Sequence, residues 1–138
     1  MPARDTNHDQ LRNALINDGW TITHDPLSMR VGRDAVFVDL GAEKLLIAEK
    51  ENRKIAAELK TFGGASEVRE LEQAFGQYFV YQAVMGEIQP DRVLYLAISN
   101  VIFEDVFSVD LGKLLLQKYS PNMIIFDVDK EVIVQWIP

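Results

Sequence analysis

The stretch KIAAELK, residues 54–60, decides the fold assignment. Its small and aliphatic residues favour a β-strand, and the side chains of a strand point alternately to its two faces. Ile55 and Leu59 therefore face one side, while Glu58 and Lys60 face the other. A carboxylate and an ammonium group so placed fit two arrangements. One is a solvated outer face, and the other is a site where the carboxylate binds Mg²⁺ and the ammonium group steadies a phosphate.

The segments on either side of this strand predict a mixed α/β (α+β) domain. An N-terminal helix ends near Asp18 and is followed by a short strand at 20–23. Extended segments at 35–40, 43–50 and 54–62 predict a three-strand meander, and a long helix follows from Glu67 to about Met85. An apolar strand at 92–99, two short helical segments and a C-terminal hairpin of 123–128 and 132–137 complete the chain. This order predicts helices packed on a central sheet.

The composition is that of one soluble globular domain covering residues 1–138. Hydrophobic residues make up 48% of the chain and charged residues 25%, which is enough for a core of ordinary size. No apolar run approaches the roughly 20 residues that span a bilayer. The N-terminus lacks the apolar core of a signal peptide, and the chain has no cysteine. We therefore expect a cytoplasmic protein with no membrane association.

The charge balance limits the function classes. Asp and Glu number 21 against 14 Lys and Arg, which gives a formal net charge of −7. Non-specific DNA binding depends on Lys and Arg that neutralise phosphates, so this charge argues against it. Any contact with nucleic acid is expected to be local, or to involve a homodimer or a partner.

Two acidic residues upstream of Glu58 are candidate metal ligands with it. Mg²⁺-dependent phosphodiester cleavage needs two or more carboxylates at one point. A two-residue turn at 51–52 would place Glu43 across from Lys60 and diagonal to Glu58 on the same face. Asp39, just before that strand, is the other candidate, and the sequence leaves open which is the main upstream ligand. The alternatives are a solvated strand end for Glu43 and a turn residue for Asp39.

The long helix adds two further candidates. Gln77 and Tyr81 are four residues apart and therefore share a helix face. An amide and a phenol on one face can hydrogen-bond a phosphate, a base or the carboxylates. The alternative interpretation is the polar flank of an amphipathic helix.

Together these residues resemble the signature of the PD-(D/E)XK nucleases. That superfamily has a restriction-endonuclease-like α-β-β-β-α-β core, and the predicted element order matches it with an extra C-terminal hairpin. The resemblance implies catalytic roles for Glu43, Glu58 and Lys60, with Gln77 and Tyr81 at the substrate. In the usual pattern Pro-Asp opens the strand before the Glu-x-Lys strand, whereas here Glu43 holds that place. The Gln-x-x-x-Tyr helix is similar to that of the branch that includes recombination nucleases.

A second resemblance covers nearly the whole chain. Five blocks in order resemble the XisH family of cyanobacterial excision-controlling factors: residues 13–26, 37–50, 55–62, 91–98 and 132–138. The resemblance implies an accessory role in removing a DNA element by site-specific recombination. It also implies a recombinase and an XisI-like protein as partners.

Two functions fit these residues. The first is an excision control factor built on a Mg²⁺-dependent endonuclease fold, able to use Mn²⁺ as a substitute, in which Glu43, Glu58 and Asp39 bind the metal. The second is a non-catalytic interaction module, with an XisI-like partner, that has lost nuclease activity. A metal site between the carboxylates separates the two.

Overall fold

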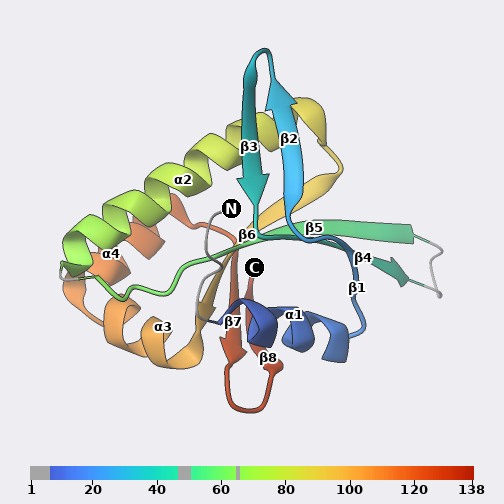
Figure 1. Ribbon diagram of the computed structural model, residues 1–138. Helices are drawn as coiled ribbons and strands as arrows, with labels where there is room; N and C mark the ends of the chain where they lie inside the picture. The colour runs from blue at the N-terminus through green and yellow to red at the C-terminus, as the bar shows by residue number, and fades with distance from the viewer. Residues whose placement is uncertain (1–6, 47–50, 65) are drawn as a thin grey trace.

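The computed structural model describes residues 7–46, 51–64 and 66–138 (Figure 1). Its elements, in chain order, are α1 (His8–Asn17), β1 (Thr21–His24), β2 (Leu27–Val31), β3 (Asp34–Val38), β4 (Leu40–Leu46), β5 (Glu51–Leu59), α2 (Glu67–Ile88), β6 (Arg92–Ser99), α3 (Asn100–Phe107), α4 (Asp110–Tyr119), β7 (Met123–Asp127) and β8 (Val132–Ile137).

One mixed sheet organises the molecule. Its strand order is β1-β4-β5-β6-β7-β8. The central strands β5, β6 and β7 are parallel to one another, whereas β1, β4 and β8 run antiparallel to their neighbours. Parallel strands need helical crossovers, which α2 provides between β5 and β6, and α3 with α4 between β6 and β7. The mixed α+β class predicted from the sequence is confirmed.

The expected three-strand meander is wrong in one respect. The strand predicted at 35–40 is split between β3 and β4, and β3 pairs with β2 in a separate two-stranded ribbon. The neighbour of β4 in the main sheet is instead β1, the short strand predicted at 20–23. The strand β2 was not predicted, because the preceding Pro26 marks a break in the extended pattern, although Leu27-Ser28-Met29 alternates as a strand should.

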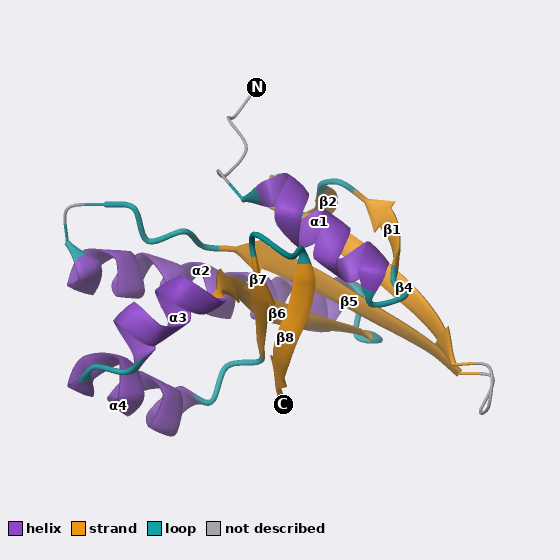
Figure 2. Cartoon of the chain, turned by 90° about the horizontal axis from the view of Figure 1, so that it is seen from below, coloured by secondary structure: helices purple, strands orange, loops and turns teal. Residues whose placement is uncertain are grey.

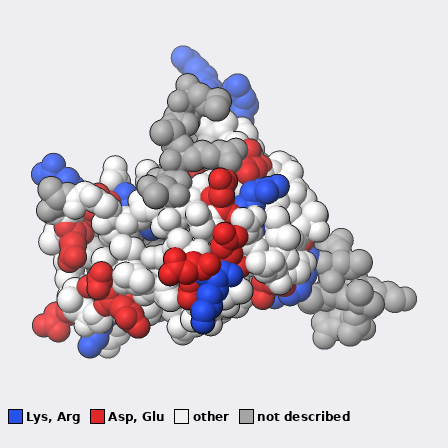
Figure 3. Space-filling view, turned by 60° about the horizontal axis from the view of Figure 1, so that its bottom comes forward, with Lys and Arg blue, Asp and Glu red and all other residues white. Residues whose placement is uncertain are grey.

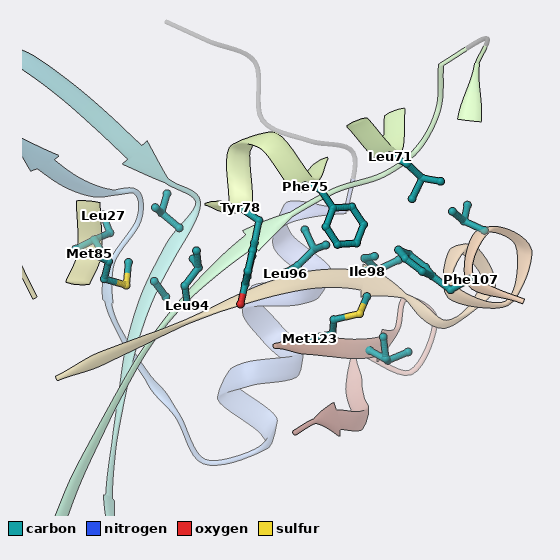
Figure 4. Close-up of a cluster of buried hydrophobic side chains, with 14 of the residues drawn as sticks. Leu27, Leu71, Phe75, Tyr78, Met85, Leu94, Leu96, Ile98, Phe107 and Met123 are labelled. Carbon is teal, nitrogen blue, oxygen red and sulfur yellow. The ribbon is translucent and has the colours of Figure 1, made fainter. Parts of the chain in front are cut away.

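Two apolar clusters fill the two faces of the sheet. On the α1 face, Leu11, Leu15 and Trp20 pack against Ile55, Leu59 and other odd-numbered residues of β5. On the opposite face, residues of α2 and α3 pack against Leu94, Leu96, Ile98 and Met123 (Figure 4). Figure 2 shows α1 on one side of the sheet and the other helices away from it. Even-numbered β5 residues, Glu58 included, therefore lie on the α2 side.

The helix α2 is the longest element, at 22 residues. The side chain of Ser66 accepts a hydrogen bond from the Arg69 backbone N–H, and Glu67 and Glu70 lie in the first turn, where the helix dipole favours acids. Among the helices in the described ranges, none is long and apolar enough to cross a membrane.

The β4–β5 register differs from the predicted one. Leu46 pairs with Glu51 and Glu43 with Lys54, so the connection between the strands comprises residues 47–50, which lie outside the described residues. Glu43 is therefore across from Lys54 rather than Lys60. The predicted two-residue turn at 51–52 is wrong, because these residues belong to β5.

Candidate functional site

The carboxylates of Asp39 and Glu58 meet where β4 and β5 separate. Asp39 lies between the end of β3 and the start of β4, and the strand register brings it opposite Glu58. The Leu59 backbone N–H donates to Asp39 Oδ2 at 2.7 Å, and the Asp39 backbone N–H donates to Glu58 Oε2 at 3.3 Å. At this end of the β4–β5 pair, these two backbone-to-carboxylate bonds take the place of backbone–backbone hydrogen bonds. They hold the Asp39 and Glu58 side chains at the same end of the two strands.

The environment of this pair concentrates negative charge. Asp39 and Glu58 are both half-buried, and the two residues before Glu58 on β5, Ala56 and Ala57, are small and buried. The phenol of Tyr81 lies within their electrostatic reach. Burial raises the pKa of Tyr81 above its ordinary value, and the negative charges of Glu58 and Asp39 raise this pKa further. A cation at this point would relieve the repulsion between the two carboxylates.

Lys60 is anchored just beyond the end of β5. Its backbone N–H donates to the carbonyl of Ala97 on β6 at 3.0 Å. Its Nζ lies 2.9 Å from Glu70 Oε2 and donates to Gln73 Oε1 at 3.3 Å. The Lys60 side chain is only 18% exposed, so this ion pair is partly shielded from solvent.

The contacts of Lys60 add two residues that were not predicted from the sequence, Glu70 and Gln73. Both lie on α2 at helical spacing from the predicted pair, Gln77 and Tyr81. Gln73 is four residues before Gln77, and Glu70 is three residues before Gln73. The four residues form one polar stripe along the helix, beside its buried stripe. Gln77 is half-buried within it. Extending the four-residue spacing of Gln77 and Tyr81 by one helical turn toward the N-terminus would have predicted Gln73 from the sequence.

Glu43 does not join this site. It shares a sheet face with Glu58 but lies four residues along β4 from position 39, roughly 13 Å at about 3.3 Å per residue. Its Oε1 is instead 3.5 Å from the Arg92 guanidinium, whose side chain is 3% exposed. Burial lowers the pKa of Arg92, and the negative charge of Glu43 partly offsets that effect. The register therefore assigns Glu43 to a structural ion pair.

The residues at the Asp39–Glu58 pair fit Mg²⁺ in kind and number. Within the described ranges, no group of three or more His, Cys, Asp or Glu is arranged to hold a metal ion. Mg²⁺, however, is commonly held by one or two carboxylates while it keeps several waters. Two adjacent carboxylates supply the hard oxygen donors that this ion prefers.

The surface charge matches the acidic composition. Figure 3 shows acidic side chains spread more widely than basic ones over the face it presents. With a formal net charge of −7, the chain has no general attraction for a polyanion. Contact with DNA therefore requires a local surface without carboxylates.

Fold and site together define a class: a small α+β domain with a carboxylate pair and an ion-paired lysine at the end of one central strand. The chain belongs to the XisH family, whose sequence model, described as "XisH protein", matches residues 1–134.

Two solved structures are similar over almost the full length. An XisH family protein from Nostoc punctiforme is 37% identical, with a TM-score of 0.87, and the match covers 97% of this chain and 100% of that one. A fdxN element excision controlling factor protein from Anabaena variabilis is 36% identical, also with a TM-score of 0.87, over 98% of this chain and 100% of that one. No curated protein matches this chain.

Proposed function

We propose that this protein is an accessory factor in the excision of a DNA element, and that it carries a Mg²⁺-dependent nuclease-type site. The family membership and the description of the Anabaena variabilis structure as an excision controlling factor support the biological role. The nuclease part of the proposal rests on one observation, the hydrogen bonds that join Asp39 to the Glu58 carboxylate and to the Leu59 backbone N–H, next to Lys60 in the chain.

The geometry supports a revised version of the PD-(D/E)XK resemblance. Asp39, rather than Glu43, is the acid placed beside Glu58, so Val38-Asp39 takes the position of the Pro-Asp pair. Asp39 and Glu58 would hold Mg²⁺, which supplies charge neutralisation at a phosphate and a water of lowered pKa. Lys60 would then contact the phosphate oxygen on which negative charge develops. Gln77 and Tyr81 would orient the substrate by hydrogen bonds.

Direct metal binding tests the site. We expect Mn²⁺ titrated calorimetrically into the protein to bind at one site, and Asp39→Asn and Glu58→Gln each to weaken this binding about tenfold or more. Glu43→Gln is the matched control, because it removes the same charge from the same sheet face without touching the pair. Equal loss in all three variants would show that Mn²⁺ responds only to the general acidity of the protein.

Nicking of supercoiled plasmid DNA with Mn²⁺ tests catalysis separately. Wild-type nicking that disappears in Glu58→Gln and Lys60→Ala supports a working nuclease. Metal binding without nicking would restrict the proposal to a control factor that retains the metal site.

A non-catalytic interaction module is the second candidate function, and the Lys60–Glu70 ion pair favours it. The ammonium group of Lys60, which would have to contact the phosphate, already contacts Glu70 and Gln73. If the site serves only for structure, a purified XisI-like protein should bind Glu58→Gln and Lys60→Ala as tightly as wild type. Glu70→Gln also separates the two functions, because releasing Lys60 should increase nicking by a nuclease and leave the affinity of a module unchanged.

A further inference from the structure

We propose that the outward face of the β2–β3 ribbon is the surface that holds double-stranded DNA beside the Asp39–Glu58 pair. This inference rests on the proposed function, namely that the protein acts at DNA. It assigns the contact to a segment that lies outside the main sheet and outside the candidate site.

The β2–β3 ribbon is anchored to the core through one of its faces. Leu27, Met29 and Val38 are at most 2% exposed and belong to the core cluster beneath α2. Figure 1 shows the two strands projecting beyond the sheet, and Figure 4 shows Leu27 beside Met85 of α2. At the tip, Val31 pairs with Asp34 around a two-residue turn, where Gly32 adopts a φ of +60° that favours glycine.

Alternation gives the ribbon one buried and one outward face. Ser28 pairs with Phe37 and Arg30 with Ala35, and all four side chains are exposed. Phe37 is 57% exposed, which is unusual for a phenylalanine in a short ribbon. Arg33 follows in the turn. The outward face therefore combines an aromatic ring, small residues and two nearby guanidinium groups.

The charge of this face is opposite to that of the whole molecule. Among the described residues, neither Arg30 nor Arg33 forms an ion pair, whereas Arg12, Lys60 and Arg92 each have an acidic partner. Asp34, the acidic residue of the ribbon, is opposite Val31 in the strand register, and alternation places both residues on the other face. In a chain of net charge −7, a carboxylate-free surface with two unpaired arginines points to an anionic partner.

Duplex DNA fits this surface in shape as well as in charge. The major groove of B-DNA is about 12 Å wide and admits a two-stranded β-ribbon. Five residues per strand give the ribbon a length of roughly 17 Å. Arginines bind phosphates by paired hydrogen bonds, the small residues Ser28 and Ala35 permit close approach, and an exposed ring such as Phe37 packs against base edges or sugars.

The ribbon leads directly into the candidate site. β3 ends at Val38, and Asp39 is the next residue. A duplex seated on the ribbon therefore has its backbone next to the carboxylate pair, where a bound Mg²⁺ would meet it. The acidic surface elsewhere repels the same duplex and limits other orientations.

Fluorescence anisotropy with a labelled duplex tests the proposal. The probe is titrated with full-length protein at low ionic strength, without divalent metal, and then at rising NaCl. The double variant Arg30→Ala/Arg33→Ala should bind about tenfold or more weakly, with its log–log salt slope reduced by about 2. The control, Lys113→Ala/Lys118→Ala, removes the same charge from exposed positions on α4 and should bind within about twofold of wild type. Phe37→Ala should weaken binding severalfold with an unchanged salt slope.

Equal losses in the two double variants, or no loss in Arg30→Ala/Arg33→Ala, would overturn the assignment of the ribbon while leaving DNA binding itself intact. No binding by wild type at low ionic strength would instead contradict the proposed function. If Arg30→Ala/Arg33→Ala binds DNA as tightly as wild type but no longer binds a purified XisI-like protein, the surface is a protein interface and the proposal is wrong. Thermal unfolding of each variant verifies that the fold is retained.

Discussion

At the scale of single residues, the clearest case is Arg92, because its partners explain why Glu43 is not at the candidate site. Arg92 donates to the carbonyl of Ile55 at 2.8 Å and to Gln89 Oε1 at 2.6 Å, and its other guanidinium nitrogen faces Glu43. A buried charge is tolerated only when its donors are satisfied. The planar guanidinium satisfies acceptors in several directions, which an ammonium group on a flexible chain does not.

Arg92→Lys should therefore destabilise the fold by about 2–4 kcal/mol, since it breaks several charged hydrogen bonds in a buried setting. Urea unfolding followed by circular dichroism measures this change. Arg33→Lys, at the exposed tip of the ribbon, is the control and should stay within about 0.5 kcal/mol of wild type. A variant Arg92→Lys as stable as wild type would mean that the network contributes little to stability.

Tyr81 reports on the candidate site through its titration. The pKa of Tyr81 is raised by burial and then by the charges of Glu58 and Asp39, from an ordinary value of 10.0. Glu58→Gln removes one of those charges, so the Tyr81 pKa should fall toward its ordinary value, while Glu43→Gln should leave it unchanged. Ultraviolet difference titration measures the shift, with Tyr81→Phe used to assign the signal. Equal shifts in the two glutamine variants would contradict the placement of Tyr81 beside Glu58.

The same shift has a consequence for stability at alkaline pH. A pKa that is higher in the folded state than in the unfolded chain gives stability that is present below about pH 10 and is lost as pH rises through the folded value. Tyr81→Phe should therefore lose less stability than wild type between neutral and strongly alkaline pH. Urea unfolding at a series of pH values measures the difference, and identical pH profiles would contradict it.

At the scale of elements, two glycines in helices have opposite surroundings. Gly112 in α4 lies against the backbone of α3, where an added Cβ would overlap the Val106 carbonyl and the Phe107 Cα. Gly76, in the middle of α2, has nothing within 4 Å of such a Cβ. Close approach of α3 and α4 therefore depends on Gly112, whereas Gly76 only weakens its helix.

Gly112→Ala should destabilise the protein by about 1–3 kcal/mol, because the neighbouring backbone has no flexible side chain to move aside. Gly76→Ala should stabilise it by about 0.5–1 kcal/mol, the usual gain in a helix interior. Thermal unfolding of both variants measures the contrast. If both changes stabilise the fold, α3 and α4 are not packed this closely.

The elements were largely predictable, but their pairing was not. Hydrophobic periodicity located α2, and the run at 92–99 located β6, since both depend on local pattern. The register of β4 with β5 depends on the length of the connection at 47–50, which alternation alone does not encode. Because of this difference in register, Glu43 lies beside Arg92 and not, as predicted, beside Glu58. Asp39 is one of the two upstream ligands that the sequence leaves open, and its position beside Glu58 depends on the hydrogen bonds at the end of the ladder, which no sequence pattern encodes.

At the scale of the whole molecule, the acidic balance and the carboxylate pair have related consequences. Self-repulsion among excess carboxylates destabilises the compact state, and any salt screens part of it. A divalent cation that binds only the folded protein adds a separate, saturable contribution of about 2.7 kcal/mol when its concentration is 100 times its dissociation constant.

These two effects can be separated in one experiment on thermal unfolding. Mg²⁺ or Mn²⁺ should raise the unfolding temperature of wild type above the value in NaCl of the same ionic strength. Glu58→Gln should lose this excess and keep the NaCl effect, whereas Glu43→Gln, with the same net charge, should retain both. An excess stabilisation that survives in Glu58→Gln would locate the cation elsewhere on the acidic surface and would remove the metal from the candidate site.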